Sequence, residues 1–166
     1  SLPSGRFVNH SVRRPVGAAA LIGATVTWAA VIWSAGGSSD TDALALRADD
    51  LGIVAHGSQV YAENCASCHG ADLAGQPNWR TAGPDGRLPA PPHDASGHTW
   101  HHDGETLFRL TKYGVGQLIG DPDYASNMPA YDGILTDADI IATFSYIKST
   151  WPRDIRDQHN AMEIQK

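Results

Sequence analysis

The sequence predicts an all-α fold, in which one long apolar helix precedes a domain of several short helices. The first observation is a run without charged residues over 16–35. The second is that apolar side chains recur three and four positions apart in segments 53–64, 105–113 and 136–151, the spacing of one helix face. The third is that glycine- and proline-rich stretches separate these segments.

The charge-free run at 16–35 has the length of a membrane-spanning helix, since about 20 apolar residues cross the hydrocarbon core of a bilayer. We expect an uncleaved transmembrane anchor here. The alternative is a cleaved signal peptide, for which Ala35-Gly36-Gly37 is an acceptable cleavage site. Ala19, Gly23 and Thr27 form a small-residue row, which is typical of helices that pack on another membrane helix but is also common in simple anchors.

Charge is distributed unevenly about this segment. Arg6, Arg13 and Arg14 precede it, whereas nine of the 12 basic residues and all 18 acidic residues follow Gly37, a formal charge of −9 for that part. Because basic residues stay on the cytoplasmic side, we expect residues 1–15 in the cytoplasm. The anchor would then lie in a bacterial inner membrane and the domain in the periplasm. The acidic domain favours basic partner surfaces, and we expect no nucleic-acid partner.

A linker is expected at 36–50, where the first residues are glycine and serine, a flexible composition. Its length is at most about 3.3–3.6 Å per residue, which keeps the following domain near the membrane surface. The domain itself is expected at 51–152. Its first helix covers 53–64, where Ile53, Gly57 and Tyr61 share one face.

Two further helices are expected in this domain. The helix at 105–113 ends at Gly114, and its expected inner face consists of Leu107, Leu110 and Tyr113. A glycine-containing loop follows it. The last helix begins at Thr136, with Asp139 three residues later in the manner of a capping box. Its apolar stripe consists of Ile140, Phe144, Ile147 and Trp151. The charged residues 153–166 are expected to form an exposed tail.

The pattern Cys65-Ala66-Ser67-Cys68-His69 is the most specific feature of the chain. C-x-x-C-H is the attachment motif of c-type haem, in which two thiols form thioethers and the histidine binds the iron. Both cysteines of the chain lie in this motif, so a Cys-rich zinc site is excluded. A thioredoxin-like dithiol is the alternative, but it requires a βαβ context that the sequence does not show. We therefore expect one covalent haem c.

The second axial ligand is expected to be Met128. The chain has two methionines; Met162 lies in the charged tail, whereas Met128 precedes Pro129 in a loop on the far side of the motif in chain order. A thioether opposite histidine is the ligand set of an electron-transfer site. On the histidine side, Leu88-Pro89-Ala90-Pro91-Pro92 cannot be a helix interior. One proline carbonyl there is expected to accept a hydrogen bond from His69.

Three stretches together resemble the class I mono-haem cytochromes c: residues 61–70 around the motif, Met128-Pro129-Ala130, and the helix at 137–148. The resemblance covers about 51–151. It implies three to five short helices around one haem, thioethers at Cys65 and Cys68, and axial ligands from His69 and Met128. It also implies that the first helix crosses the last one through Gly57 and Tyr61, against an aromatic residue such as Phe144.

The segment 91–103 departs from the smallest members of this family because it is rich in histidine. One interpretation is a copper or zinc site, although the adjacent His101 and His102 cannot easily face one ion. A second is that its side chains bond the haem edge, its propionates or nearby backbone. A third is that one of them replaces Met128. The residues concerned are His93, His98, Trp100, His101 and His102.

These features predict an electron-transfer protein rather than an enzyme, because two filled axial positions leave no place for a substrate. The expected donor is a quinol-oxidising complex (quinol:cytochrome c oxidoreductase), and the acceptor is a terminal oxidase or a photosynthetic reaction centre. One alternative is a permanently bound haem subunit of a larger respiratory or photosynthetic complex. A less favoured one is a metal-handling or sensing haem protein that uses residues 93–102.

Overall fold

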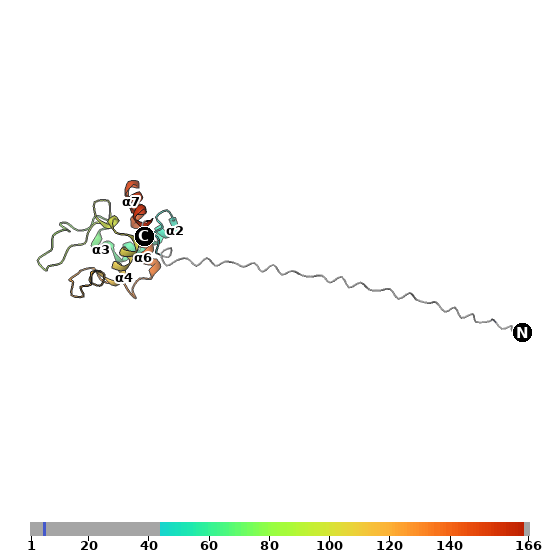
Figure 1. The fold of residues 1–166 in the computed structure, drawn as a ribbon, viewed down its shortest axis with the longest axis horizontal. Coiled ribbons are helices and arrows are strands. Elements are labelled where there is room, and N and C mark those ends of the chain that lie inside the picture. Colours follow the sequence, from blue (N-terminus) through green and yellow to red (C-terminus); the bar gives the residue numbers. More distant parts are fainter. Residues whose placement is uncertain (1–4, 6–43, 165–166) are drawn as a thin grey trace. The chain divides into compact units, whose positions relative to one another are not determined.

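The structure, a computed structural model, describes Gly5 and residues 44–164. Every regular element in these residues is a helix, which confirms the all-α prediction for this part of the chain (Figure 1). Apart from Gly5, the expected N-terminal segment 1–15, the anchor at 16–35 and the first half of the linker lie outside the described residues. Within the described residues, no helix has the length and apolar character that a membrane span requires. The elements are α2 (Leu51–Asn64), α3 (Ala66–His69), η1 (Thr99–His101), α4 (Gly104–Tyr113), α5 (Val115–Ile119), α6 (Asp137–Thr150) and α7 (Arg153–Ile164).

Helices α2 and α6 cross at Gly57, where the two backbones touch. A Cβ atom at Gly57 would overlap the carbonyl group of Ala142, so no other residue fits without separating the helices. One turn further on, Tyr61 is only 2% exposed, and its ring lies 5.6 Å from that of Tyr146 on α6. The predicted crossing is confirmed, with Tyr146 as the aromatic contact of Tyr61 and Phe144 in the same buried cluster.

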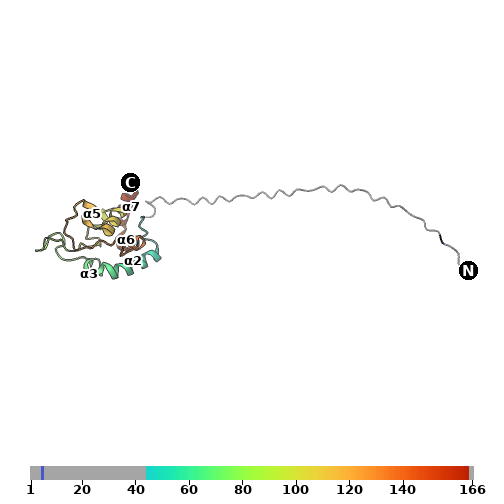
Figure 2. The same cartoon turned by 90° about the horizontal axis from the view of Figure 1, so that it is seen from below.

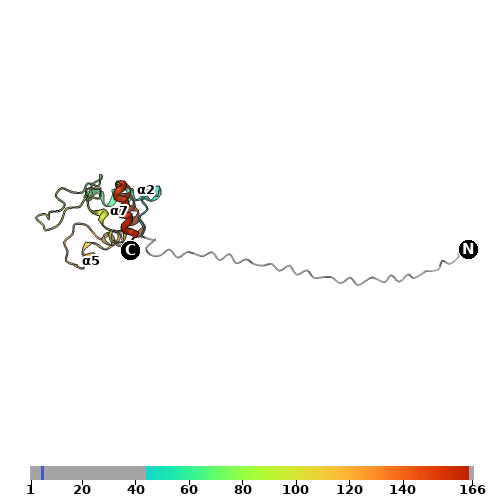
Figure 3. The same cartoon turned by 45° about the horizontal axis from the view of Figure 1, so that its top comes forward.

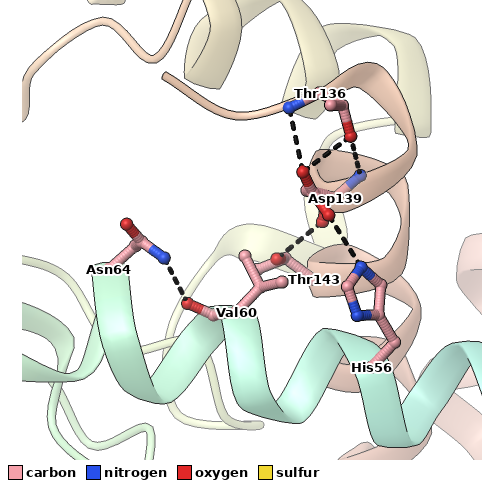
Figure 4. A network of polar contacts seen from close by, with 6 residues as sticks. All are labelled: His56, Val60, Asn64, Thr136, Asp139 and Thr143. Carbon is pink, nitrogen blue, oxygen red and sulfur yellow. Dashed lines mark hydrogen bonds and ion pairs between the residues drawn. The ribbon is translucent and has the colours of Figure 1, made fainter.

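Helix α6 begins with the predicted capping box. The Thr136 hydroxyl accepts a hydrogen bond from the Asp139 amide at 3.2 Å, and the Asp139 carboxylate accepts one from the Thr136 amide at 3.0 Å. The same carboxylate lies 2.7 Å from Nε2 of His56, so the cap also joins α6 to α2 (Figure 4). The predicted stripe is buried along its whole length, at Ile140, Phe144, Ile147 and Trp151.

The predicted inner face of α4 is confirmed in part. Leu107 is buried and Leu110 lines the main cavity of the domain, but Tyr113 is 44% exposed. Phe108 and Thr111 are buried instead of Tyr113. Apolar residues occur on two adjacent sides of this helix, so their spacing alone did not determine which side faces the core. The connection after Gly114, expected to be a loop, contains the short helix α5.

Two segments that were expected outside the domain pack against it. In the second half of the expected linker 36–50, Leu44 and Leu46 contact the core, and the amide of Arg47 donates to the Ser145 hydroxyl at 2.9 Å. The expected exposed tail 153–166 forms α7, in which His159 is completely buried. The packed domain is therefore longer at both ends than the predicted range 51–152.

Most of the described residues outside the helices lie in two long connections. Figures 2 and 3 show that the connection between α3 and η1 and the connection between α5 and α6 both extend away from α7. The first is closed on itself by tight backbone contacts. Gly97 lies against the carbonyl of Pro92, and Gly75, at φ +68°, lies against the backbone of Pro91 and Pro92. These contacts place the proline-rich stretch beside the C-x-x-C-H motif.

Candidate haem site

The C-x-x-C-H motif is wound into a helical turn. Cys65 directly follows α2, and the amide of His69 donates to the Cys65 carbonyl at 2.9 Å. Gly70 then adopts φ +81°, a backbone conformation that favours glycine, and the chain turns away. The winding brings Cys65, Cys68 and His69 to the wall of one cavity.

The two thiols are free in the structure. Burial, followed by the charge of Cys68, raises the pKa of the Cys65 thiol to about 11. A redox-active dithiol depends on a cysteine with a lowered pKa. The environment of Cys65 therefore argues against a thioredoxin-like dithiol and is compatible with a covalent thioether.

The His69 imidazole has the orientation that an iron ligand requires. Its Nδ1 donates a hydrogen bond to the carbonyl oxygen of Pro91 at 2.9 Å, which leaves Nε2 for a metal. Burial lowers the pKa of His69, so the ring is neutral at pH 7. The hydrogen bond expected from the proline-rich stretch is thus present, and the structure identifies Pro91 as its acceptor.

The cavity beside His69 has a volume of about 480 Å³, within the range of cofactor sites in proteins. The motif lies on one wall, and Met128 belongs to the lining as well. Apolar side chains from α4 and α6 line another part, namely Leu107, Leu110, Ile140, Phe144 and Ile147. Two thiols, one oriented imidazole and one thioether around an apolar space form a donor set that fits haem c.

The Met128 segment is held by polar contacts that the sequence analysis did not identify. The amide of Met128 donates to the Ser126 hydroxyl at 3.0 Å. The Tyr131 hydroxyl donates to the carbonyl of Asn64 at 2.7 Å, which joins this segment to the end of α2. For Tyr131, proximity to Met128 was the only sequence signal, because its partner Asn64 lies far away in the chain.

The histidine-rich segment divides into two parts. His93, His98 and His102 line the cavity, whereas Trp100 and His101 are absent from its lining and contact each other, with ring centroids 3.7 Å apart. Within residues 44–164, no three side chains of His, Cys, Asp or Glu lie close enough to hold a metal ion. The described structure therefore gives no support to the copper or zinc interpretation.

The outer side of His98 is covered by a stack of planar groups. The Trp79 ring is parallel to that of His98 at 5.1 Å, and the Arg80 guanidinium carbon lies 4.1 Å from the centre of the Trp79 ring. Burial, followed by the charges of His102, His101 and Arg80, lowers the pKa of His98. This end of the cavity thus presents imidazole rings backed by a cation.

Comparison with known proteins identifies the family of the chain and a curated relative. The cytochrome c family matches residues 54–151, which is more than half of the chain. A cbb3-type cytochrome c oxidase subunit CcoP from Azospirillum sp. (strain B510) is 36% identical over 101 residues, 61% of this chain and 30% of that protein. The chain therefore spans less than a third of that relative. No solved structure matches the chain.

The family match covers the elements that build the site, from α2 to the end of α6. It includes both cysteines, His69, the proline-rich stretch and Met128. The cavity and its donor set agree with this match, as does the crossing of α2 and α6 at Gly57. The chain belongs to the cytochrome c family as a class I c-type cytochrome, an electron-transfer protein that carries covalently bound haem c.

Proposed function

We propose that this protein is a membrane-anchored carrier of single electrons, with thioethers at Cys65 and Cys68 and with His69 and Met128 as the axial ligands. Haem c supplies one-electron redox chemistry when bound. The observation that carries the proposal is that His69 and Met128 line one apolar cavity together with both cysteines. A ligand from each of these two residues leaves no coordination position for a substrate.

The protein's own residues define the conditions for this transfer. Pro91 fixes the tautomer of His69. The apolar walls from α4 and α6 exclude water, which disfavours the more highly charged oxidised state and raises the reduction potential. His98 and His102, at the cavity wall, are the residues of the histidine-rich segment best placed to contact the haem edge.

We place the domain in the periplasm, tethered to the inner membrane by the charge-free run at 16–35. The donor in this proposal is a quinol:cytochrome c oxidoreductase. The relative's description as an oxidase subunit favours a terminal oxidase as the acceptor over a photosynthetic reaction centre. The excess of acidic over basic residues suits a partner with a basic docking face.

The axial assignment is tested with the two methionines of the chain. Met128→Leu should abolish the weak long-wavelength absorption band of thioether-ligated oxidised haem and lower the reduction potential. Met162→Leu, in α7, is the matched control and should leave both unchanged. The assignment would be refuted if Met128→Leu retained the band. It would also be refuted if carbon monoxide bound to the reduced wild-type protein.

A second candidate function is a permanently bound haem subunit of a terminal oxidase. The description of the relative as a subunit CcoP favours this function. Purification of the full chain from membranes in a mild detergent distinguishes the two. A carrier elutes alone with its haem, whereas a subunit elutes with stoichiometric amounts of other membrane proteins.

A further inference from the structure

The ring of His93 is stacked on that of His69. Their centroids are 4.1 Å apart and their planes differ by 23°. His93 lies two residues after Pro91, which accepts the hydrogen bond from Nδ1 of His69. One short stretch of chain therefore contacts the His69 imidazole twice, at its edge through Pro91 and on its face through His93.

The orientation of the His93 ring is itself determined by a hydrogen bond. The Thr99 hydroxyl donates to the carbonyl of Pro92 at 3.3 Å, so its oxygen accepts from Nδ1 of His93, at 2.8 Å. Thr99 is 5% exposed, which protects this pair from water. An apolar side chain would fill the same space, but it would not have a plane set by Thr99.

The backbone of His93 is held on both sides as well. Its amide donates to the carbonyl of Leu73 at 2.8 Å, and its carbonyl accepts from Nε1 of Trp151 at 2.8 Å. The edge of its ring meets those of Phe144 and Tyr61, at centroid distances of 6.4 and 6.2 Å. Burial, followed by the charge of His69, keeps the pKa of His93 well below its usual value, so two neutral rings are stacked.

We propose that His93 is a positioning residue that fixes the rotation of the His69 imidazole about its bond to the iron. The proposal rests on the assignment of His69 as an axial ligand. The hydrogen bond at Nδ1 alone still allows the His69 ring to rotate about that contact. The His93 ring lies against the face of the His69 ring and is itself held by Thr99, so it restricts this rotation. The His69 plane is then the same in both oxidation states, which keeps the rearrangement during electron transfer small.

The test uses variants that change the stack without changing any iron ligand. Thr99→Val keeps the shape of residue 99 but removes the acceptor for His93. His93→Phe keeps a flat ring without the hydrogen bond, and His93→Leu removes the ring. Thr150→Val is the matched control, because the Thr150 hydroxyl also donates to a backbone carbonyl, that of Ile147, at 2.7 Å, on the exposed end of α6.

The measurement is the proton NMR spectrum of the oxidised holoprotein, in which the spread and order of the shifted haem methyl resonances depend on the planes of the axial ligands. We expect a changed pattern in Thr99→Val, a larger change in His93→Leu and a smaller one in His93→Phe. Thr150→Val should match the wild type. All variants should retain covalent haem and the low-spin absorption spectrum.

A wild-type pattern in Thr99→Val together with either His93 variant would overturn the proposal, since His93 would then be a space-filling residue only. Should His93→Leu fail to mature, Thr99→Val and His93→Phe decide the question. A wrong assignment of Met128 can be distinguished from a wrong role of His93, because the wild-type protein would then lack the long-wavelength absorption band. Failure of the His69 assignment appears as a retained low-spin spectrum in His69→Ala.

Discussion

The Gly57 Cα on α2 faces the Ala142 carbonyl on α6 so closely that even a methyl group at residue 57 would overlap it. This contact sets the distance between the two helices. Because α2 leads directly into Cys65, and α6 supplies Ile140, Phe144 and Ile147 to the cavity, the same distance determines the width of the site.

Gly57→Ala should destabilise the protein by about 1–3 kcal/mol or more, because a backbone contact cannot relax as a side chain does. The free energy of unfolding, from denaturant titration, measures this. Gly52→Ala is the control, since a Cβ there would meet only the Asp50 carboxylate, at 3.4 Å. Gly52 lies in the first turn of α2, so that change should stabilise by less than the roughly 0.5–1 kcal/mol typical of a helix interior. Equal effects of the two substitutions would contradict the close crossing.

Asp139→Asn should reduce stability at neutral pH by about 1 kcal/mol, the usual contribution of a helix cap. The hydrogen bond from the Thr136 hydroxyl, aided by the Thr136 amide and His56, lowers the pKa of Asp139. The folded state thus binds its proton less readily than the unfolded state, so this stabilisation is present above about pH 3.9 and is lost as the pH falls through the folded pKa.

The wild type and Asp139→Asn should therefore converge in stability at low pH, as measured by urea denaturation at pH 7 and pH 3. Asp157→Asn serves as the control, because its exposed carboxylate lies 3.8 Å from Arg153 and such pairs contribute little. A difference between wild type and Asp139→Asn that stays constant down to the acid limit would show that the charge is not responsible.

His159→Leu should destabilise the protein by about 1–3 kcal/mol, because it leaves buried Lys148 without its acceptor. Nζ of Lys148 lies 3.1 Å from Nδ1 of His159, and Nε2 of His159 donates to the carbonyl of His102 at 3.1 Å. Burial, followed by the charge of Lys148, lowers the pKa of His159 to about 4. As the pH falls, His159 is therefore protonated in the unfolded state, where its pKa is about 6.5, before it is protonated in the folded state.

Stability contributed by neutral His159 is complete above about pH 6.5 and declines towards pH 4. In His159→Leu this part of the decline should disappear, which unfolding measurements from pH 7.5 to pH 4 can detect. Gln158→Leu changes an exposed neighbour on α7 and should retain the decline. An unchanged pH profile in His159→Leu would place the titrating group elsewhere.

Tyr131→Phe should release the Met128 segment at a lower temperature than in the wild type. The lost hydrogen bond, from the Tyr131 hydroxyl to the Asn64 carbonyl, contributes about 1 kcal/mol and joins this segment to α2. The long-wavelength absorption band of the oxidised protein, followed during heating, reports the loss of the thioether ligand. Tyr124→Phe, which alters another tyrosine of the cavity lining, is the comparison. Identical melting of the band in both variants would argue against the role of Tyr131.

The features that were predictable from the sequence depend on neighbours in the chain. The Thr136–Asp139 capping box and the stripe from Ile140 to Trp151 are local patterns with one helical solution. The C-x-x-C-H motif is local as well. Gly57 was predictable only through the family resemblance, because its partner, Ala142, is distant in sequence.

What the sequence did not predict depends on tertiary contacts. Helix α7 is mostly polar. Besides Ile155, which contacts the core, it packs through His159, whose polar atoms are satisfied by Lys148 and His102. The stack of His93 on His69 requires the tight loop closure at Gly97, which no periodic pattern encodes. Proline composition limited the acceptor for His69 to a few carbonyls, but only the folded loop distinguishes Pro91 from the others.

The packing of Leu44, Leu46 and Arg47 against the core has a consequence for how far the haem can travel. If the proposed anchor ends at residue 35, only residues 36–43 separate it from the packed part of the domain. A chain of that length spans at most roughly 29 Å, against roughly 54 Å for 36–50. Compared with the longer tether, the volume that the domain can reach is roughly sixfold smaller. The local concentration of haem near a partner fixed in the same membrane is higher by the same factor. A short tether favours repeated electron transfer with one neighbouring protein over transfer between several distant partners.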